Sequence, residues 1–455
     1  MSPRAAPEPP VAGAWAPTAL RTLPWREPLE VLSAFADEPF ALALLSDGRG
    51  WSYVLREPEA ALTVGPDDPR DALEALPGLL GPAAAADSEG PPFQGGAAGL
   101  LGYELGGRIE PASGAGGGEW PVVACGVYAR VLAFDHDRRR IVAVGRGRDP
   151  AEAAAHADAA AGWASAAAQA PAEGRLAEVF AAVGGAGAYE AAVAAVVARI
   201  RAGELFQANI ARGWGCRLAA GARPFDLLAR LAAESPAPFC GYLRLEDRAL
   251  VSNSPERFVR VDSGGVVETR PIKGTRARGG SAEEDARLAA ELASSAKDRA
   301  ENLMIVDLMR NDLARVCAPG SVTAPELFAV ESYANVHHLV STVRGTLAPG
   351  AGAVDVLGAT FPPGSVTGAP KVQAMRVIAA REPPRGPYCG ALFWAGFDGR
   401  MDSSVLIRTA ACVERDGGWD VEARAGAGIT ADSDPAAESA EAEAKIGAIR
   451  AALVG

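Results

Sequence analysis

The sequence has few aromatic residues and no long apolar segment. Aromatic residues make up 6% of the 455 residues although 49% are hydrophobic, so much of the hydrophobic content is alanine. No apolar run reaches the roughly 18 residues that a membrane-spanning helix needs. The segment around Glu8, Pro9 and Pro10 lacks the apolar centre of a signal peptide. We therefore expect a soluble protein of the cytoplasm that has no membrane partner.

The sequence also lacks an excess of basic residues and paired cysteines. It has 44 Lys and Arg against 56 Asp and Glu, a formal net charge of -12, which argues against a nucleic-acid partner. No Cys-x-x-Cys pair occurs, so zinc-binding spacing is absent and free thiols in a reducing compartment are expected. The cysteines concerned are Cys125, Cys216, Cys240, Cys317, Cys389 and Cys412. A small-molecule task fits this composition better.

The pattern of apolar residues predicts a mixture of strands and helices. Short apolar runs broken by turn residues fill the first 170 residues or so and are typical of strands and hairpins. Apolar residues spaced three and four apart over 193–200 indicate an amphipathic helix. Because the two kinds do not alternate regularly, we predict the α+β class. An alanine-rich stretch over residues 151–172 places a boundary between an N-terminal region, 1–175, and a second region, 176–455.

Two pairs of carboxylates have helical spacing. Asp298 and Glu301 stand three residues apart, and Glu438 and Glu441 repeat that spacing near the C-terminus. Two helices that each present such a pair could together hold Mg²⁺, which prefers oxygen ligands. On spacing alone, two solvated acidic faces are the commoner arrangement.

Lys273 and Glu256 are candidates for catalysis. Lys273 stands between Ile272 and Gly274 where a strand runs into a turn, and a desolvated lysine can lose its proton and act as a nucleophile. Glu256, next to Pro255, could be a general acid if burial raises its pKa. A solvated lysine and a surface salt bridge are the ordinary alternatives.

Further polar groups occur in three places. Residues 364–371 (GSVTGAPK) place hydroxyls and glycines at a turn that could bind an anion, although an ordinary helix-capping turn is commoner. For His337 and His338, the favoured interpretation is a histidine that is buried and hydrogen-bonded within the fold. Arg408 could pair with a substrate carboxylate or form a structural salt bridge. No cysteine lies in a Gly-x-Cys-x-Gly setting, so we expect no built-in glutaminase.

Together these segments resemble the chorismate-utilising enzymes. The resemblance is carried by residues 270–275 (RPIKGT), 298–312 (DRAENLMIVDLMRND), 336–341 (VHHLVS), 364–371 (GSVTGAPK), 407–409 (IRT) and 431–433 (ADS), in unbroken order. Upstream, residues 92–103 resemble the N-terminal region of the same family, so the similarity covers nearly the whole chain. It implies a fold of two facing antiparallel β-sheets surrounded by helices, with the site between the sheets.

Two positions separate the branches of this family. Isochorismate and salicylate synthases carry a water-activating lysine where this sequence has Gln207, so the resemblance implies an enzyme that adds ammonia. Anthranilate synthases read Pro-Ile-Ala-Gly-Thr where this sequence has Lys273, as the aminodeoxychorismate synthases do. The expected product is therefore 4-amino-4-deoxychorismate, on the way to 4-aminobenzoate and folate. Anthranilate formation and an inactive regulatory homologue are the alternatives.

The resemblance also implies roles for individual residues. Glu256 matches the general acid and Lys273 the covalent nucleophile. Mg²⁺ would be held by Glu301, Glu438 and Glu441, with Asp298 assisting from outside this set. Positions that match substrate contacts are Gln207, Thr275, His338, Thr367, Tyr388, Arg408, Gly426 and Lys445.

The expected partners follow from the same resemblance. They are chorismate and a separate glutamine amidotransferase subunit that supplies ammonia. Relatives can hold tryptophan in the N-terminal region, but the matching residues 44–47 diverge and leave that open. Ala427 replaces a glycine usual in the family, and we expect its methyl group to lie near the substrate carboxylate.

Overall fold

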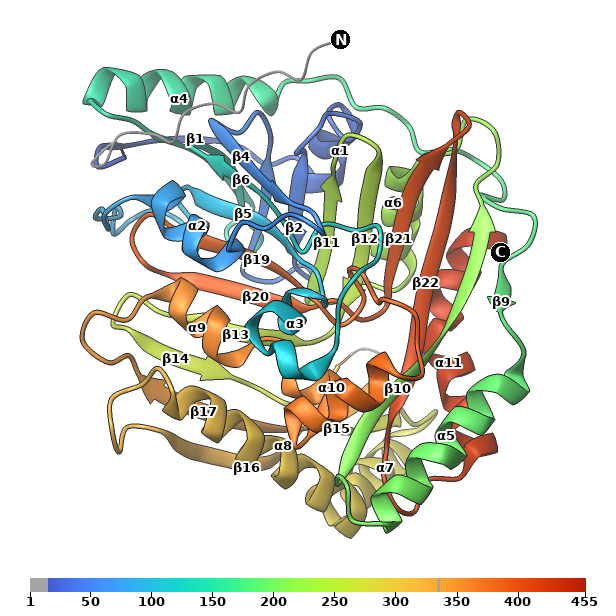
Figure 1. Ribbon diagram of the computed structural model, residues 1–455. Helices are drawn as coiled ribbons and strands as arrows, with labels where there is room; N and C mark the ends of the chain where they lie inside the picture. Colours follow the sequence, from blue (N-terminus) through green and yellow to red (C-terminus); the bar gives the residue numbers. More distant parts are fainter. Residues whose placement is uncertain (1–14, 334–335) are drawn as a thin grey trace.

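The computed structural model describes residues 15–333 and 336–455, which form two large antiparallel sheets with helices around them (Figure 1). This arrangement confirms the predicted α+β class and the two facing sheets. None of the helices in the described residues combines the length and the apolar character that a membrane span requires.

The first sheet contains twelve strands among the described residues. In spatial order they are β1 (Thr18–Pro24), β8 (Arg140–Arg146), β7 (Arg130–Asp135), β3 (Trp51–Leu55), β2 (Leu42–Leu45), β11 (Phe239–Arg244), β12 (Arg248–Ser254), β21 (Thr409–Arg415), β22 (Gly418–Ile429), β10 (Gln207–Arg217) and β18 (Gly368–Ala369). The short strand β9 (Ala181–Val183) pairs with β10.

The second sheet contains ten strands within the same described ranges. Their order is β15 (Ile272–Ala277), β17 (Val336–Thr346), β14 (Val266–Thr269), β13 (Arg257–Val261), β20 (Met401–Val405), β19 (Ala391–Gly396), β5 (Gly96–Leu101), β6 (Val123–Tyr128) and β4 (Ala60–Val64). Strand β16 (Thr323–Ser332) pairs with β17.

Strands from the two ends of the chain pair within both sheets. In the first sheet β2 pairs with β11, and in the second β5 pairs with β19. The predicted boundary at 175/176 falls in residues 164–180, which contain no helix or strand. The division into two regions stays a prediction.

The helices cover the outer faces of the sheets. They are α1 (Pro28–Ser33), α2 (Ala72–Leu80), α3 (Leu105–Ile109), α4 (Pro150–Trp163), α5 (Ala186–Arg201), α6 (Pro224–Glu234), α7 (Ala282–Ser294), α8 (Ala296–Ala314), α9 (Ala353–Thr360), α10 (Lys371–Ala379) and α11 (Pro435–Val454). Helices α5, α6 and α11 pack together on the first sheet, and α8 packs on β17 and β15 of the second (Figure 1).

The helices that carry the predicted carboxylate pairs begin at side-chain caps. Asp434 accepts a hydrogen bond from the Ala437 amide at 2.9 Å, and Pro435 occupies the first turn of α11. Ser295 caps α8 in the same way through the Asp298 amide, at 3.2 Å. These caps fix where each helix starts and therefore which carboxylates face the sheets.

Candidate active site

The predicted site residues lie on elements of both sheets and on the two capped helices. Glu256 immediately precedes β13, Lys273 lies on β15, and Gln207 begins β10. Helix α8 packs on β15, and α11 packs on β22, which pairs with β10. Segments more than 200 residues apart in sequence therefore supply one site.

Glu256 is a buried carboxyl group. Its side chain is 6% exposed, and its backbone amide donates to the Ser254 hydroxyl at 3.2 Å. Burial raises the pKa of Glu256 to about 7, while a hydrogen bond from Ser365 and the charges of Lys273 and Lys445 act in the opposite direction. A carboxyl group with this pKa holds a proton in a large fraction of molecules near neutral pH, as a general acid must.

Lys273 and Gln207 converge on a glycine of β22. A Cβ atom placed on Gly428 would lie 3.1 Å from the Lys273 Nζ and 2.8 Å from the Gln207 Nε2. Burial lowers the pKa of Lys273, with the Lys445 charge acting in the same direction and the Glu301, Glu256 and Glu441 carboxylates opposing it. A lysine in this setting loses its proton more readily than a solvated one and can attack an electrophile.

Gln207 has a buried side-chain amide beside Lys273. The residue is 0% exposed, and within the described residues neither its Oε1 nor its Nε2 has a partner. An unsatisfied buried amide costs about 1–3 kcal/mol. Such a group beside Lys273 is available to bind a ligand.

Thr275 and His338 form a pair across β15 and β17. The Thr275 hydroxyl lies 2.9 Å from the His338 Nδ1. The pKa of His338 is lowered to about 4, mainly by burial and also by the Arg408 charge, with the Glu331 charge acting in the opposite direction. His338 is therefore neutral at pH 7, with one ring nitrogen able to donate and one able to accept a hydrogen bond.

Arg408 has no ion pair among residues 15–333 and 336–455. Of the two interpretations, the structural salt bridge is thus not formed within the described chain, and burial, with no charged partner, is what acts on the Arg408 guanidinium. Its backbone has a φ of 51°, and burial lowers the pKa of its guanidinium. Arg408 is therefore a partly buried cation near His338 whose guanidinium can bind a carboxylate.

The turn at residues 364–369 is held mainly by its own hydrogen bonds. The Thr367 hydroxyl donates to the Pro363 carbonyl at 3.1 Å. Lys371 donates to Asp312 and to the Thr360 carbonyl, both at 2.6 Å, so its charge has a structural partner. The Ser365 hydroxyl of this turn approaches the Glu256 carboxyl group, and the sequence indicated it only as one of several hydroxyls.

The structure gives the surroundings of three further residues that the sequence singled out. Lys445 donates to the Gly426 carbonyl at 2.9 Å and lies 2.6 Å from a Glu441 oxygen. Tyr388 is 6% exposed, and burial raises the pKa of its hydroxyl well above its ordinary value. His337 is bonded to Ser332 and to Asp285 instead, as the structural reading predicts for one of the two histidines.

The predicted metal ligands lie near one another, but two of them are paired with basic side chains. Burial raises the pKa of Glu301 and of Glu438, and the charge of Glu438 contributes to the rise at Glu301. Asp298, however, lies 3.1 Å from Arg276, and Glu441 is paired with Lys445, as described above. No group of three or more potential ligands in the described part of the chain is placed to hold a metal. The oxygen donors suit Mg²⁺ chemically, but their positions are not those of a formed metal site, so magnesium stays a prediction.

Ala427 does not face the catalytic groups. It is 3% exposed and belongs to the apolar core formed with Ile210 and Trp214. Side chains alternate between the two faces of a strand, so Gly428, which faces Lys273, places Ala427 on the opposite face. The expectation that this methyl group lies at the substrate carboxylate is therefore wrong.

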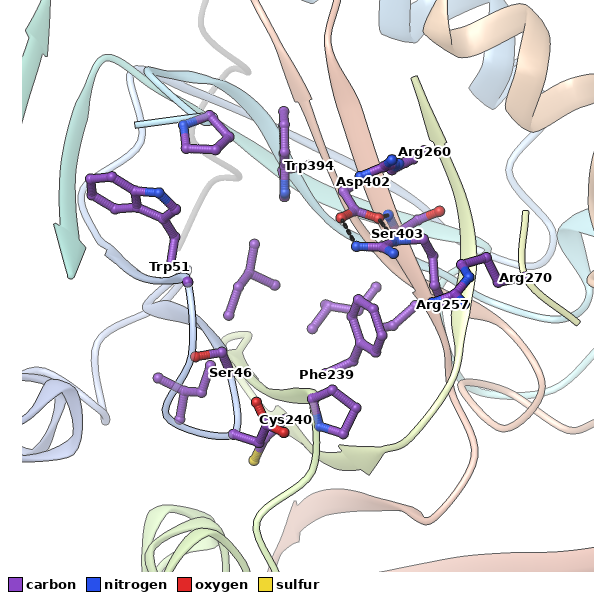
Figure 2. A pocket seen from close by; sticks show the side chains of 18 of the residues that line it. Ser46, Trp51, Phe239, Cys240, Arg257, Arg260, Arg270, Trp394, Asp402 and Ser403 are labelled. Carbon is purple, nitrogen blue, oxygen red and sulfur yellow. Dashed lines mark hydrogen bonds and ion pairs between the residues drawn. The ribbon is translucent and has the colours of Figure 1, made fainter. Parts of the chain in front are cut away.

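A cavity of about 710 Å³ lies beside these elements and includes the divergent residues 44–47 (Figure 2). Trp51, Trp394 and Phe239 form part of its apolar lining, and the Arg257–Asp402 ion pair, at 2.9 Å, forms part of its polar lining. The cavity also contacts Pro255 and Ile272, the neighbours of the two catalytic candidates. A ligand here would touch the segments that carry them.

Comparison with known proteins identifies the class to which this fold and site belong. Residues 41–451 match the family described as chorismate binding enzyme, and the chain belongs to that family. Within it, the chain is 42% identical to aminodeoxychorismate synthase component 1 of Klebsiella aerogenes, over 79% of this chain and 77% of the relative. It is 37% identical to aminodeoxychorismate synthase component 1 of Escherichia coli, over 94% and 93% of the two chains.

A solved structure shows the same fold. The crystal structure of anthranilate synthase component I from Streptococcus pneumoniae superimposes with a TM-score of 0.75 at 28% identity, covering 88% of this chain and 92% of that one. The family resemblance inferred from the sequence motifs is thereby confirmed. Aminodeoxychorismate synthases and anthranilate synthases are both similar to this chain. The choice between their two reactions therefore depends on the residues of the site.

Proposed function

We propose that this chain converts chorismate and ammonia to 4-amino-4-deoxychorismate. The observation that carries the proposal is the convergence of Lys273 and the unpaired Gln207 amide on Gly428. The similarity to aminodeoxychorismate synthases over most of the chain supports it. Gln207 is a neutral amide and cannot deprotonate water, which disfavours water addition to the same ring.

The reaction needs an acid and a nucleophile, and the site offers both. Glu256 donates its proton to the ring hydroxyl, which leaves as water. At the same time the neutral Lys273 amine attacks the far end of the diene, forms a carbon–nitrogen bond and then loses a proton. Ammonia next bonds to the vacated carbon and gives up a proton while the two ring double bonds shift back. The Lys273–carbon bond breaks with its electron pair returning to the lysine nitrogen, which takes up a proton and leaves as the free amine. Two easier displacements thus replace one difficult one.

Arg408 and the neutral His338 can hold the substrate in place. Arg408 carries an unpaired positive charge among the described residues, which suits the enolpyruvyl carboxylate. Thr275 fixes the orientation of the His338 ring through their 2.9 Å contact. Thr367, Tyr388, Gly426 and Lys445 are proposed as the remaining contacts.

Mg²⁺ is the proposed cofactor. Glu301, Glu438 and Glu441 would hold it, with Asp298 assisting, and it would neutralise the ring carboxylate of chorismate. Binding would require Glu441 to leave its 2.6 Å contact with Lys445. The three carboxylates supply the oxygen donors that this ion takes.

Two partners complete the proposal. A separate glutamine amidotransferase would supply ammonia, so that the overall reaction transfers an amino group from glutamine to chorismate for 4-aminobenzoate and folate synthesis. The cavity of about 710 Å³ is a candidate site for tryptophan. The six cysteines are free thiols, which suits the reducing cytoplasm in which we propose that the protein acts.

The decisive experiment is incubation with chorismate, Mg²⁺ and ammonium, followed by chromatography with and without added aminodeoxychorismate lyase. We expect 4-aminobenzoate only when the lyase is added. Fluorescent anthranilate formed without the lyase would contradict the proposal and favour the anthranilate synthase reaction. During turnover, intact mass spectrometry should show a chorismate-derived adduct that Lys273→Ala abolishes.

A further inference from the structure

Arg385 is a buried arginine for which the proposed chemistry has no use. It lies in the loop between α10 and β19 and is 4% exposed. Its Nε and Nη2 donate to the two carboxylate oxygens of Glu382, each at 2.9 Å, in a two-pronged ion pair. Burying such a pair is costly unless its remaining donors and acceptors are satisfied.

The remaining hydrogen bonds of this pair run to the backbone of two site elements. Arg385 donates to the Asn209 carbonyl on β10 at 2.6 Å and to the Val366 carbonyl at 3.2 Å. Glu382 accepts from the Ala211 amide at 2.8 Å. The ion pair therefore binds β10, which begins with Gln207, to the turn that carries Ser365.

A third segment approaches from the N-terminal part of the chain. The carboxylate of Glu104 accepts from the backbone amides of Arg385 and Gly386, at 2.6 and 3.0 Å. The guanidinium of Arg385 lies 4.8 Å from the centre of the Tyr103 ring and 5.7 Å from that of Tyr388. The loop that carries Tyr388 is thus fixed from both sides.

We propose that Arg385, through its pair with Glu382, is a positioning residue that holds Gln207 and Tyr388 where ammonia meets the Lys273 adduct. The inference rests on the proposed function. Lys273 does not belong to this network, since it lies on the other sheet and no hydrogen bond joins it to Arg385 within the described residues. Glu256 is linked to the network only indirectly, through the turn that carries Ser365. The network should therefore affect discharge of the adduct more than its formation.

The test is Arg385→Lys, which keeps the charge but loses the planar fork that reaches Glu382 and both carbonyls at once. Ammonium-dependent turnover, the KM for chorismate and the adduct fraction by intact mass spectrometry are measured together. We expect kcat to fall at least tenfold, the KM to change less than threefold, and the adduct to form on at least as large a fraction of chains as in the wild type. The adduct fraction counts chains that are folded and competent for the first step.

Two further variants keep the test decisive. If Arg385→Lys unfolds, the double variant Arg385→Met with Glu382→Gln takes its place. It removes both charges of the ion pair, so that no buried carboxylate is left without a partner. Asp135→Asn changes a buried carboxylate of β7 that is paired with Arg138 and Arg140. We expect this control to lower the melting temperature but to leave kcat per folded molecule unchanged.

The outcomes separate this inference from the proposed function. A kcat within twofold of the wild type in the folded Arg385 variants would overturn it, as would a fall in kcat matched by the fall in adduct fraction. If the wild-type chain itself forms no 4-amino-4-deoxychorismate with ammonium, the proposed function is wrong instead.

Discussion

Replacing Glu256 by glutamine should stabilise the protein at alkaline pH. Burial raises the pKa of this carboxyl group from 4.5 to about 7, so the folded state holds the proton more tightly than the unfolded state. That difference corresponds to about 3 kcal/mol. Between pH 4.5 and 7 the folded state binds more protons, so the contribution of Glu256 to stability falls as pH rises and is fully unfavourable above pH 7.

The assay compares urea unfolding of the wild type and of Glu256→Gln at pH 5 and at pH 8. We expect the variant to gain about 2–3 kcal/mol relative to the wild type between the two pH values. Effects of the amide that do not depend on pH cancel in this difference. Glu234→Gln, at the exposed end of α6, controls for the loss of one charge. A gain of zero, or a loss, would refute the assignment of a raised pKa to Glu256, and with it the physical basis for a general acid.

Other changes give equally specific outcomes. Ser365→Ala removes the hydroxyl group that lowers the pKa of Glu256, the proposed general acid. The alkaline limb of the pH profile of kcat/KM should therefore move to higher pH by about one unit, and an unchanged limb would exclude this contact. Gly428→Ala places a methyl group 2.8 Å from the Gln207 amide and 3.1 Å from the Lys273 amine, and ammonium-dependent kcat should fall more than about tenfold, since misplacing reacting groups is costly. Ala427→Gly removes a core methyl group and should lower the free energy of unfolding by about 1 kcal/mol in urea titrations, with no change in the KM for chorismate; a large change in that KM would return Ala427 to the site.

The sequence predicted the candidate catalytic groups better than the residues that hold them in place. Glu256, Lys273 and Gln207 lie in short motifs whose chemistry and order are recognisable, and the structure gathers them. Arg385 and Glu104 could not be predicted as partners because 281 residues separate them and Glu104 binds the backbone amide of Arg385, a contact that leaves no local sequence pattern.

The direction in which a strand residue points could not be predicted from the sequence either. Ala427 lies between two glycines, and the sequence alone does not say which of the three faces the site. Strand alternation answers this only after the pairing of β22 with β10 is known. The metal ligands show the same limit, because helical spacing predicts a shared face but not the cations that occupy it.

The pairing of β2 with β11 and of β5 with β19 has a consequence for synthesis and folding. Each pair joins segments about 200 or more residues apart, so neither sheet can close until most of the chain has left the ribosome. Until then the unpaired edges of β2 and β5 are open to other chains. A fragment that begins at residue 176 would carry the same hazard permanently at β11 and β19, and we expect it to aggregate unless the N-terminal segment is supplied in trans.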